Sequence, residues 1–442
     1  MGSGIVGNAP HTLVSPLNRM QRAIIWACWL GGGLGRLIYI LVIHPATQHI
    51  YSDMQGYVDR ALRSAAGVPE YIADTLYPPG ASMFFAALYR VDPSWALAAI
   101  GQWLIALGVM ALIWQMARRL YGNGAAVAAL VLATLYFPFT HYAALFLAEN
   151  VFTFLSLLSF YSLLRAGQAA GIAALRWALA AGIALALAAA FKNTIVLPAI
   201  CTAVVWLVFA KKYGGHGGWP MAFGVVIGFT LLIVPLSQRC TRLNEGRFCL
   251  VSNNLAMNVL MGHYGETGEF RWHDRPRGIT MYFTAVESAT RGYTASADFD
   301  FGPYDSTLNL RVASDWIRLH PAAALKLSLE NVGTLFGRQT LWPAAVYRGF
   351  DIGAWSQKFF DALILFPALI VFARRAPAML RGKQDSLPEW LLLAPIIGVA
   401  AAVFLSIAEV RFRVPFDGLL IIAAAPLYAL IGGRYATAPS WA

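Results

Sequence analysis

The stretch ALAAIGQWLIALGVMALIWQMARR (residues 96–119) decides the fold class of this chain. Residues 96–117 carry no charged side chain, and Arg118 and Arg119 follow at once. An apolar run of about 20 residues can cross the hydrocarbon core of a bilayer as a helix. Arginines at one end of such a run indicate the cytoplasmic side. We therefore interpret the stretch as a membrane span that ends inside the cell.

The composition of the whole chain supports a membrane protein. Of its 442 residues, 58% are hydrophobic and only 12% are charged, whereas a soluble domain carries about 25% charged residues. We attribute most of the net charge of +11 to basic residues at the inner ends of spans, so it does not indicate nucleic-acid binding. The first 20 residues are largely polar, and we expect no cleavable signal peptide.

Basic residues at the ends of the other apolar runs give one consistent topology. Arg19 and Arg22 precede the first run, which predicts a cytoplasmic N-terminus, and the C-terminus is predicted on the same side. We predict an all-α polytopic membrane protein with about ten transmembrane helices. The predicted spans cover residues 23–43, 96–117, 124–143, 147–164, 177–191, 194–210, 219–236, 356–373, 390–408 and 417–433.

The spans divide the chain into four predicted parts. The longest part without an apolar run is predicted to form a small periplasmic cap that is irregular at first and then helical around 305–318 and 321–335. The parts are a cytoplasmic N-terminus (1–22), a first transmembrane half with an outer loop at 44–95 (23–236), the periplasmic loop or cap (237–354) and the C-terminal transmembrane helices (355–442).

The first outer loop is predicted to hold two interfacial helices. In IYSDMQGYVDRALRSAAG (50–67), a helix over 52–66 would place Asp53, Tyr57 and Arg60 on one polar face. YPPGASMFFAALYRV (77–91) is apolar but too short to span a bilayer. We interpret it as an interfacial or re-entrant helix that starts at Pro78-Pro79.

Common motifs for soluble cofactors and for hydrolytic chemistry are missing from the sequence. It contains no Walker motif, no GxGxxG after a strand, no HExxH and no GxSxG. The predicted cytoplasmic loops are all short, so we expect any chemistry to take place outside and without a soluble nucleotide. A donor carried in the membrane would meet this condition.

The four cysteines fall into two pairs. Cys28 and Cys201 lie in apolar runs and are expected to be inert. Cys240 and Cys249 lie in RCTRLNEGRFC (239–249) and flank its turn-like NEG stretch. If this loop is periplasmic, the oxidising compartment favours a disulfide between them, and two free thiols are the alternative.

Several motifs together resemble a known family. They are an acid after the first span, the YPPG turn (77–80), ARRLYG (117–122), LAENVFTFLSLL (147–158), VSNNLAMNVLMGHYG (251–265), IRLHP (317–321) and EVRFRVPFDGLLI (409–421). In this order they resemble the GT-C superfamily of membrane glycosyltransferases, in the bacterial branch of aminoarabinose transferases and protein O-mannosyltransferases (glycosyltransferase family 39). We expect the chain to be shorter than those enzymes and to lack a separate soluble C-terminal domain. It has Tyr77 where they can carry a basic residue.

The resemblance implies an inverting glycosyltransferase that moves a sugar from a polyprenyl-phosphate donor to a hydroxyl acceptor at the periplasmic face of the bacterial inner membrane. It implies that Asp53 is the general base, and we expect desolvation to raise the pKa of this carboxyl. Capping of the interfacial helix is the alternative role for Asp53. Glu149 is expected to orient the acceptor or assist the base. The alternative is that its charge only interacts favourably with the dipole of its own helix.

Five cations are candidates for binding the donor phosphate. They are Arg36, Arg60, Lys192, Arg411 and Arg413. Arg411 and Arg413 are interpreted as a two-pronged clamp, with anchoring to lipid headgroups as the alternative. Glu409 is expected to neutralise one of the two. The alternative for Arg36 is that its side chain snorkels to the membrane interface. The alternative for Arg60 is an ion pair with a nearby Asp, and the alternative for Lys192 is an interfacial position without a role in binding.

Aromatic and histidine side chains complete the predicted site. Tyr57, Tyr77, His263 and Tyr264 are candidates for contact with the sugar or acceptor, and a structural role is the alternative for His263. No cofactor is predicted to be required, and the sequence gives little support to a divalent metal shared by Asp53 and Glu149. The expected partners are the lipid-linked donor, a lipid or glycan acceptor and membrane lipids, without nucleic acid. The alternatives to an enzyme are a transporter or flippase of lipid-linked sugars and a non-catalytic assembly subunit.

Overall fold

The computed structural model describes residues 16–212, 218–264, 269–275, 278–284, 295–300, 302–338, 343, 346–347 and 350–431. Helices form most of it. The helical elements are α1 (Arg19–Ala27), η1 (Cys28–Gly32), α2 (Gly33–Ile38), η2 (Tyr39–Ile43), η3 (Ala46–Gln48), α3 (Asp53–Ala65), η4 (Ile72–Thr75), α4 (Gly80–Val91), α5 (Ala96–Leu135), α6 (Phe137–His141), η5 (Tyr142–Ala144), α7 (Glu149–Gln168), α8 (Gly171–Phe191), η6 (Asn193–Ile195), α9 (Val196–Lys212), α10 (Gly218–Leu243), α11 (Leu255–His263), α12 (Ser306–Leu319), α13 (Pro321–Gly333), η8 (Thr334–Arg338), α14 (Ile352–Phe360), η9 (Asp361–Leu365), α15 (Phe366–Leu380), η10 (Gln384–Ser386), α16 (Leu387–Phe404) and α17 (Val410–Ile431).

Long apolar helices confirm the predicted polytopic membrane protein. Seven of the described helical stretches are long and apolar enough to cross a membrane. The predicted count of ten is not confirmed. α7 and α9 overlap the predicted spans 147–164 and 194–210, whereas the predicted span 124–143 is divided between the second half of α5, α6 and η5. The 40-residue α5 is broken at Gly122, whose φ of 83° and ψ of −174° are not helical. Glycine adopts such a φ without the clash of a Cβ, so α5 can change direction after Arg118 and Arg119.

The region 237–354 contains strands that the sequence interpretation missed. β1 (Glu269–Arg275), β2 (Gly278–Thr284) and β3 (Ala295–Phe299) form an antiparallel sheet in which Trp272 pairs with Met281. Strand β2, GITMYFT, is rich in the β-branched and aromatic residues that strands favour. The two short strands β4 (Val346–Tyr347) and β5 (Phe350–Asp351) form a second pair. The helices predicted around 305–318 and 321–335 are α12 and α13.

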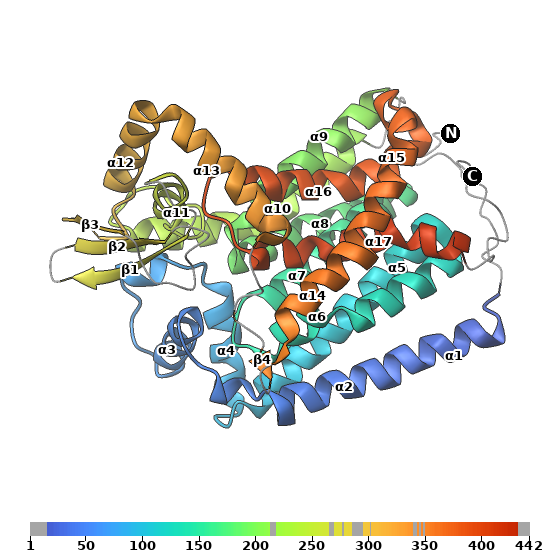
Figure 1. The fold of residues 1–442 in the computed structure, drawn as a ribbon, viewed down its shortest axis with the longest axis horizontal. Helices are drawn as coiled ribbons and strands as arrows, with labels where there is room; N and C mark the ends of the chain where they lie inside the picture. The colour runs from blue at the N-terminus through green and yellow to red at the C-terminus, as the bar shows by residue number, and fades with distance from the viewer. Residues whose placement is uncertain are drawn as a thin grey trace.

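The elements sort to two ends of the molecule (Figure 1). α1 begins and α17 ends at the right-hand end of the view, whereas α3, α11, α12 and β1–β3 gather at the left-hand end. The first outer loop and the 237–354 region therefore share one end, as the predicted topology requires. We call this the loop end. Its periplasmic location and the cytoplasmic location of the termini stay predictions.

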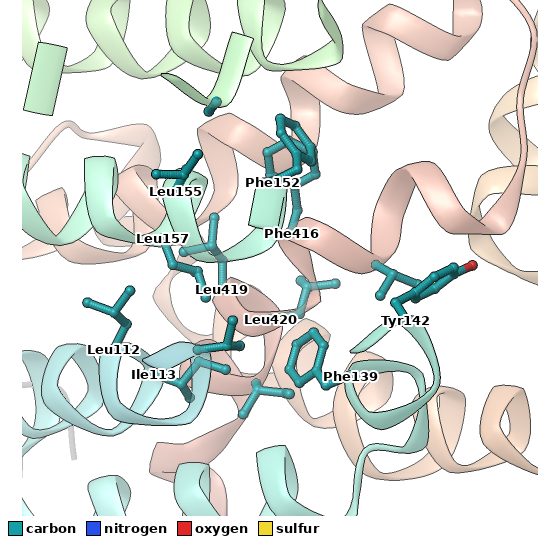
Figure 2. Packing of buried hydrophobic residues seen from close by; sticks show 14 of the residues in the cluster. Leu112, Ile113, Phe139, Tyr142, Phe152, Leu155, Leu157, Phe416, Leu419 and Leu420 are labelled. Carbon is teal, nitrogen blue, oxygen red and sulfur yellow. The ribbon is translucent and has the colours of Figure 1, made fainter. Parts of the chain in front are cut away.

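Helix α17 passes through the centre of the helix bundle. Phe416, Leu419 and Leu420 of α17 are buried against side chains of α5, α6 and α7 (Figure 2). A helix that is apolar on all sides is typical of such a central position. As a result, the charged residues just before and at the start of α17 are held in the middle of the loop end.

The two helices of the first outer loop are confirmed. The helix predicted over 52–66 is α3, and the helix predicted to start at Pro78-Pro79 is α4, with Pro79 as its N-cap. Gly80 approaches α8 closely, because a Cβ placed there would lie 2.6 Å from Ala190 O. Helix α4 is thereby packed against the end of α8 that precedes Lys192.

Candidate active site

Four chain segments bring charged side chains together at the loop end. Asp53 is the first residue of α3, Glu149 is the first residue of α7, and Lys192 directly follows α8. Glu409 precedes α17, and Arg411 lies in its first turn. We call these five residues the acid–cation cluster, in which contacts connect three carboxylates and two cations.

The Asp53 carboxylate is held by two hydrogen-bond donors. Tyr77 Oη donates to Asp53 Oδ1 at 3.0 Å, and Arg411 Nη1 donates to Oδ2 at 2.8 Å. Burial alone would raise the pKa of Asp53, but the charge of Arg411, these two hydrogen bonds and the charge of Lys192 outweigh it, so the pKa lies below its ordinary value. The expected rise in the pKa is therefore wrong, because the sequence could not show which cation faces this carboxylate.

The backbone before Asp53 is strained. Ser52 has φ of 52° and ψ of −129°, a conformation that residues other than glycine rarely adopt. The side chain of Ser52 makes no capping hydrogen bond within the described residues. Asp53 is the first residue of α3, not its N-cap, and its oxygens face Tyr77 and Arg411. Backbone strain of this kind is concentrated at functional sites.

Arg411 is the centre of the acid–cation cluster. Besides Asp53, its guanidinium contacts Glu149, with Nη1 3.8 Å from Oε1. It also pairs with Glu409 through Nε, and Nη2 donates to Glu409 Oε1 at 3.3 Å. Glu409 thus neutralises part of the charge of Arg411. Burial raises the pKa of Glu409 although Arg411 opposes the rise.

Glu149 and Lys192 form a buried ion pair. Lys192 Nζ lies 2.7 Å from Glu149 Oε1, and the Glu149 side chain is 1% exposed. The other carboxylate oxygen, Oε2, is buried without a hydrogen-bond partner among the described residues. Burial lowers the pKa of the Lys192 amine, and the charge of Glu149 offsets this only in part. An oxygen left open in this way is suited to accept a hydrogen bond from a ligand.

Arg60 lies against the aromatic rings of the predicted site. Its guanidinium carbon is 4.6 Å from the centre of the Tyr77 ring and 5.3 Å from that of Tyr57. Its Nε donates to Gly56 O of the same helix at 2.9 Å. Nη2 is buried and has no hydrogen-bond partner within the described part of the chain. The predicted alternative, a pair with a nearby Asp, is absent from the described contacts, since Asp59 accepts from Gln55.

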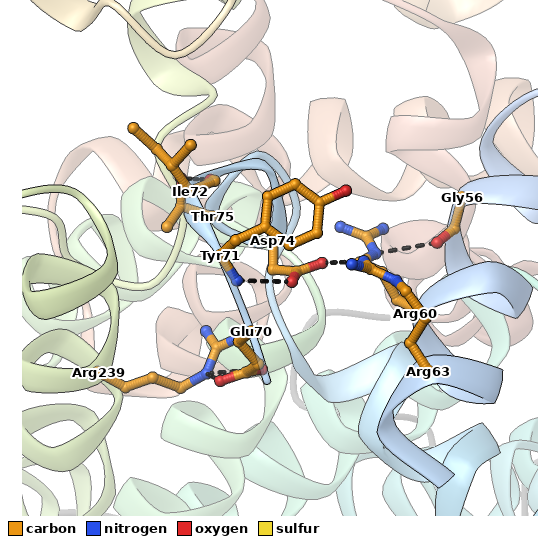
Figure 3. Close-up of polar contacts among 9 residues, drawn as sticks. All are labelled: Gly56, Arg60, Arg63, Glu70, Tyr71, Ile72, Asp74, Thr75 and Arg239. Atoms are coloured by element: carbon orange, nitrogen blue, oxygen red, sulfur yellow. Dashed lines mark hydrogen bonds and ion pairs between the residues drawn. The ribbon is translucent and has the colours of Figure 1, made fainter. Parts of the chain in front are cut away.

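The stretch before Tyr77 is fixed by ion pairs that the sequence interpretation missed (Figure 3). Asp74 pairs with Arg63 of α3 and accepts from Tyr71 N at 3.0 Å. Arg239 of α10 holds Glu70, with Nε 2.9 Å from Oε2. The partners in these pairs are separated by up to 169 residues, and pairing over such a distance gives no signal in a single sequence.

Arg413 and Arg36, like Arg60, are predicted phosphate ligands that lie outside the acid–cation cluster. Arg413 pairs with Asp417 at 2.9 Å and donates to Leu335 O at 3.1 Å. Side chains two residues apart on a helix point about 200° apart, so Arg411 and Arg413 cannot both face one site from α17. Arg36 donates to Ala133 O at 2.8 Å, at the end of α5.

The remaining predicted residues connect elements of the 237–354 region. His263 Nδ1 lies 2.9 Å from Val259 O, and Nε2 lies 3.0 Å from Ser328 Oγ of α13. The ring of Tyr264 lies 6.1 Å from that of Trp316. Cys240 and Cys249 form a disulfide with a Cα–Cα distance of 5.4 Å. Within the described residues, no group of three or more His, Cys, Asp or Glu side chains is arranged to hold a metal ion.

Comparison with known proteins identifies one matching family model. Residues 77–237 match the model of the dolichyl-phosphate-mannose-protein mannosyltransferases. The matched stretch runs from Tyr77 through most of α10 and includes Glu149 and Lys192. It confirms the resemblance to the GT-C superfamily. No curated protein matches the chain.

Among solved structures, the chain is similar to ArnT from Cupriavidus metallidurans. The form bound to undecaprenyl phosphate is 14% identical with a TM-score of 0.41, covering 91% of this chain and 78% of that chain. The apo form is 15% identical with a TM-score of 0.37, covering 92% of this chain and 76% of that chain.

Proposed function

We propose that this chain is an inverting glycosyltransferase that transfers a sugar from a polyprenyl-phosphate donor to a hydroxyl acceptor at the periplasmic face of the inner membrane. The observation that carries the proposal is the Asp53 carboxylate, held by Tyr77 and Arg411 in a cluster built from helix ends at the loop end of the molecule. The family match over residues 77–237 supports the reaction class. The acceptor is a glycolipid, lipopolysaccharide, polysaccharide or protein hydroxyl.

In the proposed reaction Asp53 takes the proton of the acceptor hydroxyl. The hydroxyl oxygen attacks the anomeric carbon from the face opposite the phosphate. The bond from the anomeric carbon to the phosphate oxygen breaks, and its electron pair leaves with the lipid phosphate. The product therefore has the inverted configuration, and the proton is held on Asp53 until water or the phosphate removes it.

Donor binding would activate the base. A carboxylate paired with Arg411 is a weak base because its pKa is lowered. A phosphate that binds Arg411 would compete with Asp53 for the same guanidinium, and loss of that pairing raises the pKa of a buried carboxyl. Deprotonation of the acceptor would then be favoured only when the donor is present.

Three cations are the proposed phosphate ligands. Arg411 is central, Lys192 is buried beside it, and Arg60 has a buried Nη2 that lacks a partner among the described residues. Arginine and lysine stabilise the charge of a departing phosphate. We assign Glu149 to binding of the acceptor, because its open Oε2 can accept a hydrogen bond from a second hydroxyl of the acceptor.

The test is a transfer assay with the purified full-length chain in liposomes of bacterial lipid extract. A panel of radiolabelled polyprenyl-phosphate sugars is supplied, and label transferred to lipid, glycan or protein is counted. Removal of a general base costs about 10²–10⁴-fold in rate, so Asp53→Asn should lose transfer to that extent and still bind the donor. Asp59→Asn, an exposed acid on the same helix, is the matched control and should transfer normally.

Two results would overturn the proposal. Asp53→Asn could transfer as fast as the unmodified chain, which would remove the base from the mechanism. Alternatively, labelled donor could cross the liposome membrane without any product, which would favour the transporter.

A further inference from the structure

We propose that residues 249–254 (CLVSNN), here called the 249–254 segment, position two of the polar groups that hold carboxylates of the acid–cation cluster, Tyr77 and Lys192. The inference rests on the proposed function. The segment carries no charged residue, and no described hydrogen bond connects it to Asp53 or Glu149. Its proposed role is to place the side chains that touch them.

The segment is fixed at its start to α10. The Cys240–Cys249 disulfide connects it to the last turns of that helix, and Ser237 Oγ donates to Cys249 O at 2.8 Å. Cys249 N in turn donates to Thr241 Oγ1 at 3.2 Å. Val251, Ser252 and Asn253 are buried. A mostly buried segment with these attachments is a rigid support for its neighbours.

One branch leads from the segment to Tyr77. Asn253 N donates to Thr75 O at 2.7 Å, two residues before Tyr77. The Asn253 side chain is also fixed, since Nδ2 donates to Asn244 Oδ1 at 3.0 Å and to Tyr304 O at 2.7 Å. Tyr77 then donates to Asp53. The same loop is held from its other sides by the pairs of Asp74 and Glu70 (Figure 3).

A second branch leads to Lys192. Asn193 Nδ2 donates to Ser252 Oγ at 2.6 Å, and Ser252 Oγ donates to Asn254 Oδ1 at 3.0 Å. Asn193 directly follows Lys192, which pairs with Glu149. Ser252 and Asn253 are adjacent, so one dipeptide supports both the loop that carries Tyr77 and the residue that follows Lys192.

This arrangement matters because the two carboxylates share one guanidinium. Arg411 Nη1 lies 2.8 Å from Asp53 and 3.8 Å from Glu149. A shift of either carboxylate therefore changes how strongly the guanidinium interacts with each of them. A displacement of about 1 Å at a catalytic group can cost roughly 10²-fold in rate. The 249–254 segment prevents such a displacement from both sides.

The experiment separates positioning from simple stabilisation. Ser252→Ala removes the acceptor of Asn193, Ser252→Thr keeps a hydroxyl, and Asn193→Ala removes the donor. We expect Ser252→Ala to lower kcat about tenfold or more with KM for the donor within about threefold, because the geometry is altered and not the binding surface. Ser252→Thr should recover most of kcat, and the double variant should be no worse than either single variant. Ser314→Ala on α12, whose hydroxyl donates to Arg311 O of its own helix, is the control.

A second measurement does not depend on the reaction. Hydrogen–deuterium exchange of the peptides that contain Tyr77 and Lys192 is followed in the same samples. Ser252→Ala should speed exchange at the Lys192 peptide, and Cys240→Ser with Cys249→Ser should speed it at both. If Ser252→Ala only lowers the melting temperature while kcat and exchange at the Lys192 peptide are unchanged, the inference is wrong. If exchange changes as expected but the unmodified chain transfers no sugar, the proposed function fails and the positioning stands.

Discussion

Arg411 Nη1 lies 2.8 Å from Asp53 Oδ2, although 358 residues separate the two in the chain. The same guanidinium contacts Glu149 and Glu409. Burying this many charges is costly unless each finds partners, so the cluster is a fixed unit of mutually dependent ions. Its response to substitution is therefore expected to be large, and its pH dependence should report on the Asp53–Arg411 pair.

Replacing Arg411 should move the acid side of the pH–rate profile. In the unmodified chain the pKa of Asp53 is below 3.8, chiefly because the charge and hydrogen bond of Arg411 overcome burial. With Arg411→Gln, burial is no longer opposed by that charge, and the pKa rises. The rate should then begin to fall at a higher pH as the medium is acidified. Residual transfer measured from pH 4 to pH 8 checks this, and an unmoved acid limb would contradict it.

The same variant should be much less stable. Removing one partner of a buried ion pair costs about 3–5 kcal/mol because the remaining charges are left buried without compensation. Thermal unfolding in detergent, followed by tryptophan fluorescence, measures the loss. Arg411→Lys keeps a positive charge without the planar guanidinium and should lose less stability than Arg411→Gln.

Asp53 should contribute stability in a defined pH range. A carboxyl whose pKa is lower in the folded state stabilises the fold above its unfolded pKa, near 3.8, and this contribution disappears as the pH falls through the folded pKa. The stability difference between the unmodified chain and Asp53→Asn should therefore be constant from pH 5 to pH 7. It should shrink below pH 4. A difference that grows on acidification would show that the pKa of Asp53 is raised instead.

Tyr77→Phe should act in the same direction as Arg411→Gln but more weakly. It removes the hydrogen bond to Asp53 Oδ1, which lowers the pKa of Asp53 less than the charge of Arg411 does. The ring that lies under Arg60 is kept. We expect kcat to fall by about tenfold, equivalent to roughly 1.4 kcal/mol, with KM for the donor unchanged. Tyr77→Leu, which also removes the ring, should raise KM for the donor. Equal KM values in Tyr77→Phe and Tyr77→Leu would mean that Arg60 does not bind the donor.

Local sequence patterns predicted the helices of this chain better than its polar contacts. The period of apolar residues and the Pro78-Pro79 pair predicted α3 and α4, because both signals act within a few residues. The family motifs singled out Asp53, Glu149 and Arg411, whereas Lys192 was singled out by its position between two predicted spans. The structure brings these four residues together. The motif EVRFRVP could not show that Arg413 faces Asp417, since that depends on the rotation of α17 within the bundle. The lowered pKa of Asp53 could not be predicted either, because its main cause is Arg411, near the opposite end of the chain.

The crossing of α8 and α10 provides a test of the membrane core that is independent of the active site. A Cβ on Gly182 would lie 2.1 Å from Val225 O and 2.7 Å from Phe229 N. Both are backbone atoms, so the helices would have to separate. Small residues permit close backbone approach between membrane helices, and overpacking costs about 1–3 kcal/mol.

Gly182→Ala should therefore lower the melting temperature in detergent, even though alanine favours the helical conformation. Gly31→Ala is the matched control, because no described atom outside its own helical turn and chain neighbours lies within 4 Å of a Cβ at that position. This control should be neutral or slightly stabilising, since only the helical preference changes. Equal melting temperatures for Gly182→Ala and Gly31→Ala would mean that α8 and α10 do not approach as closely as the distance to Val225 O indicates.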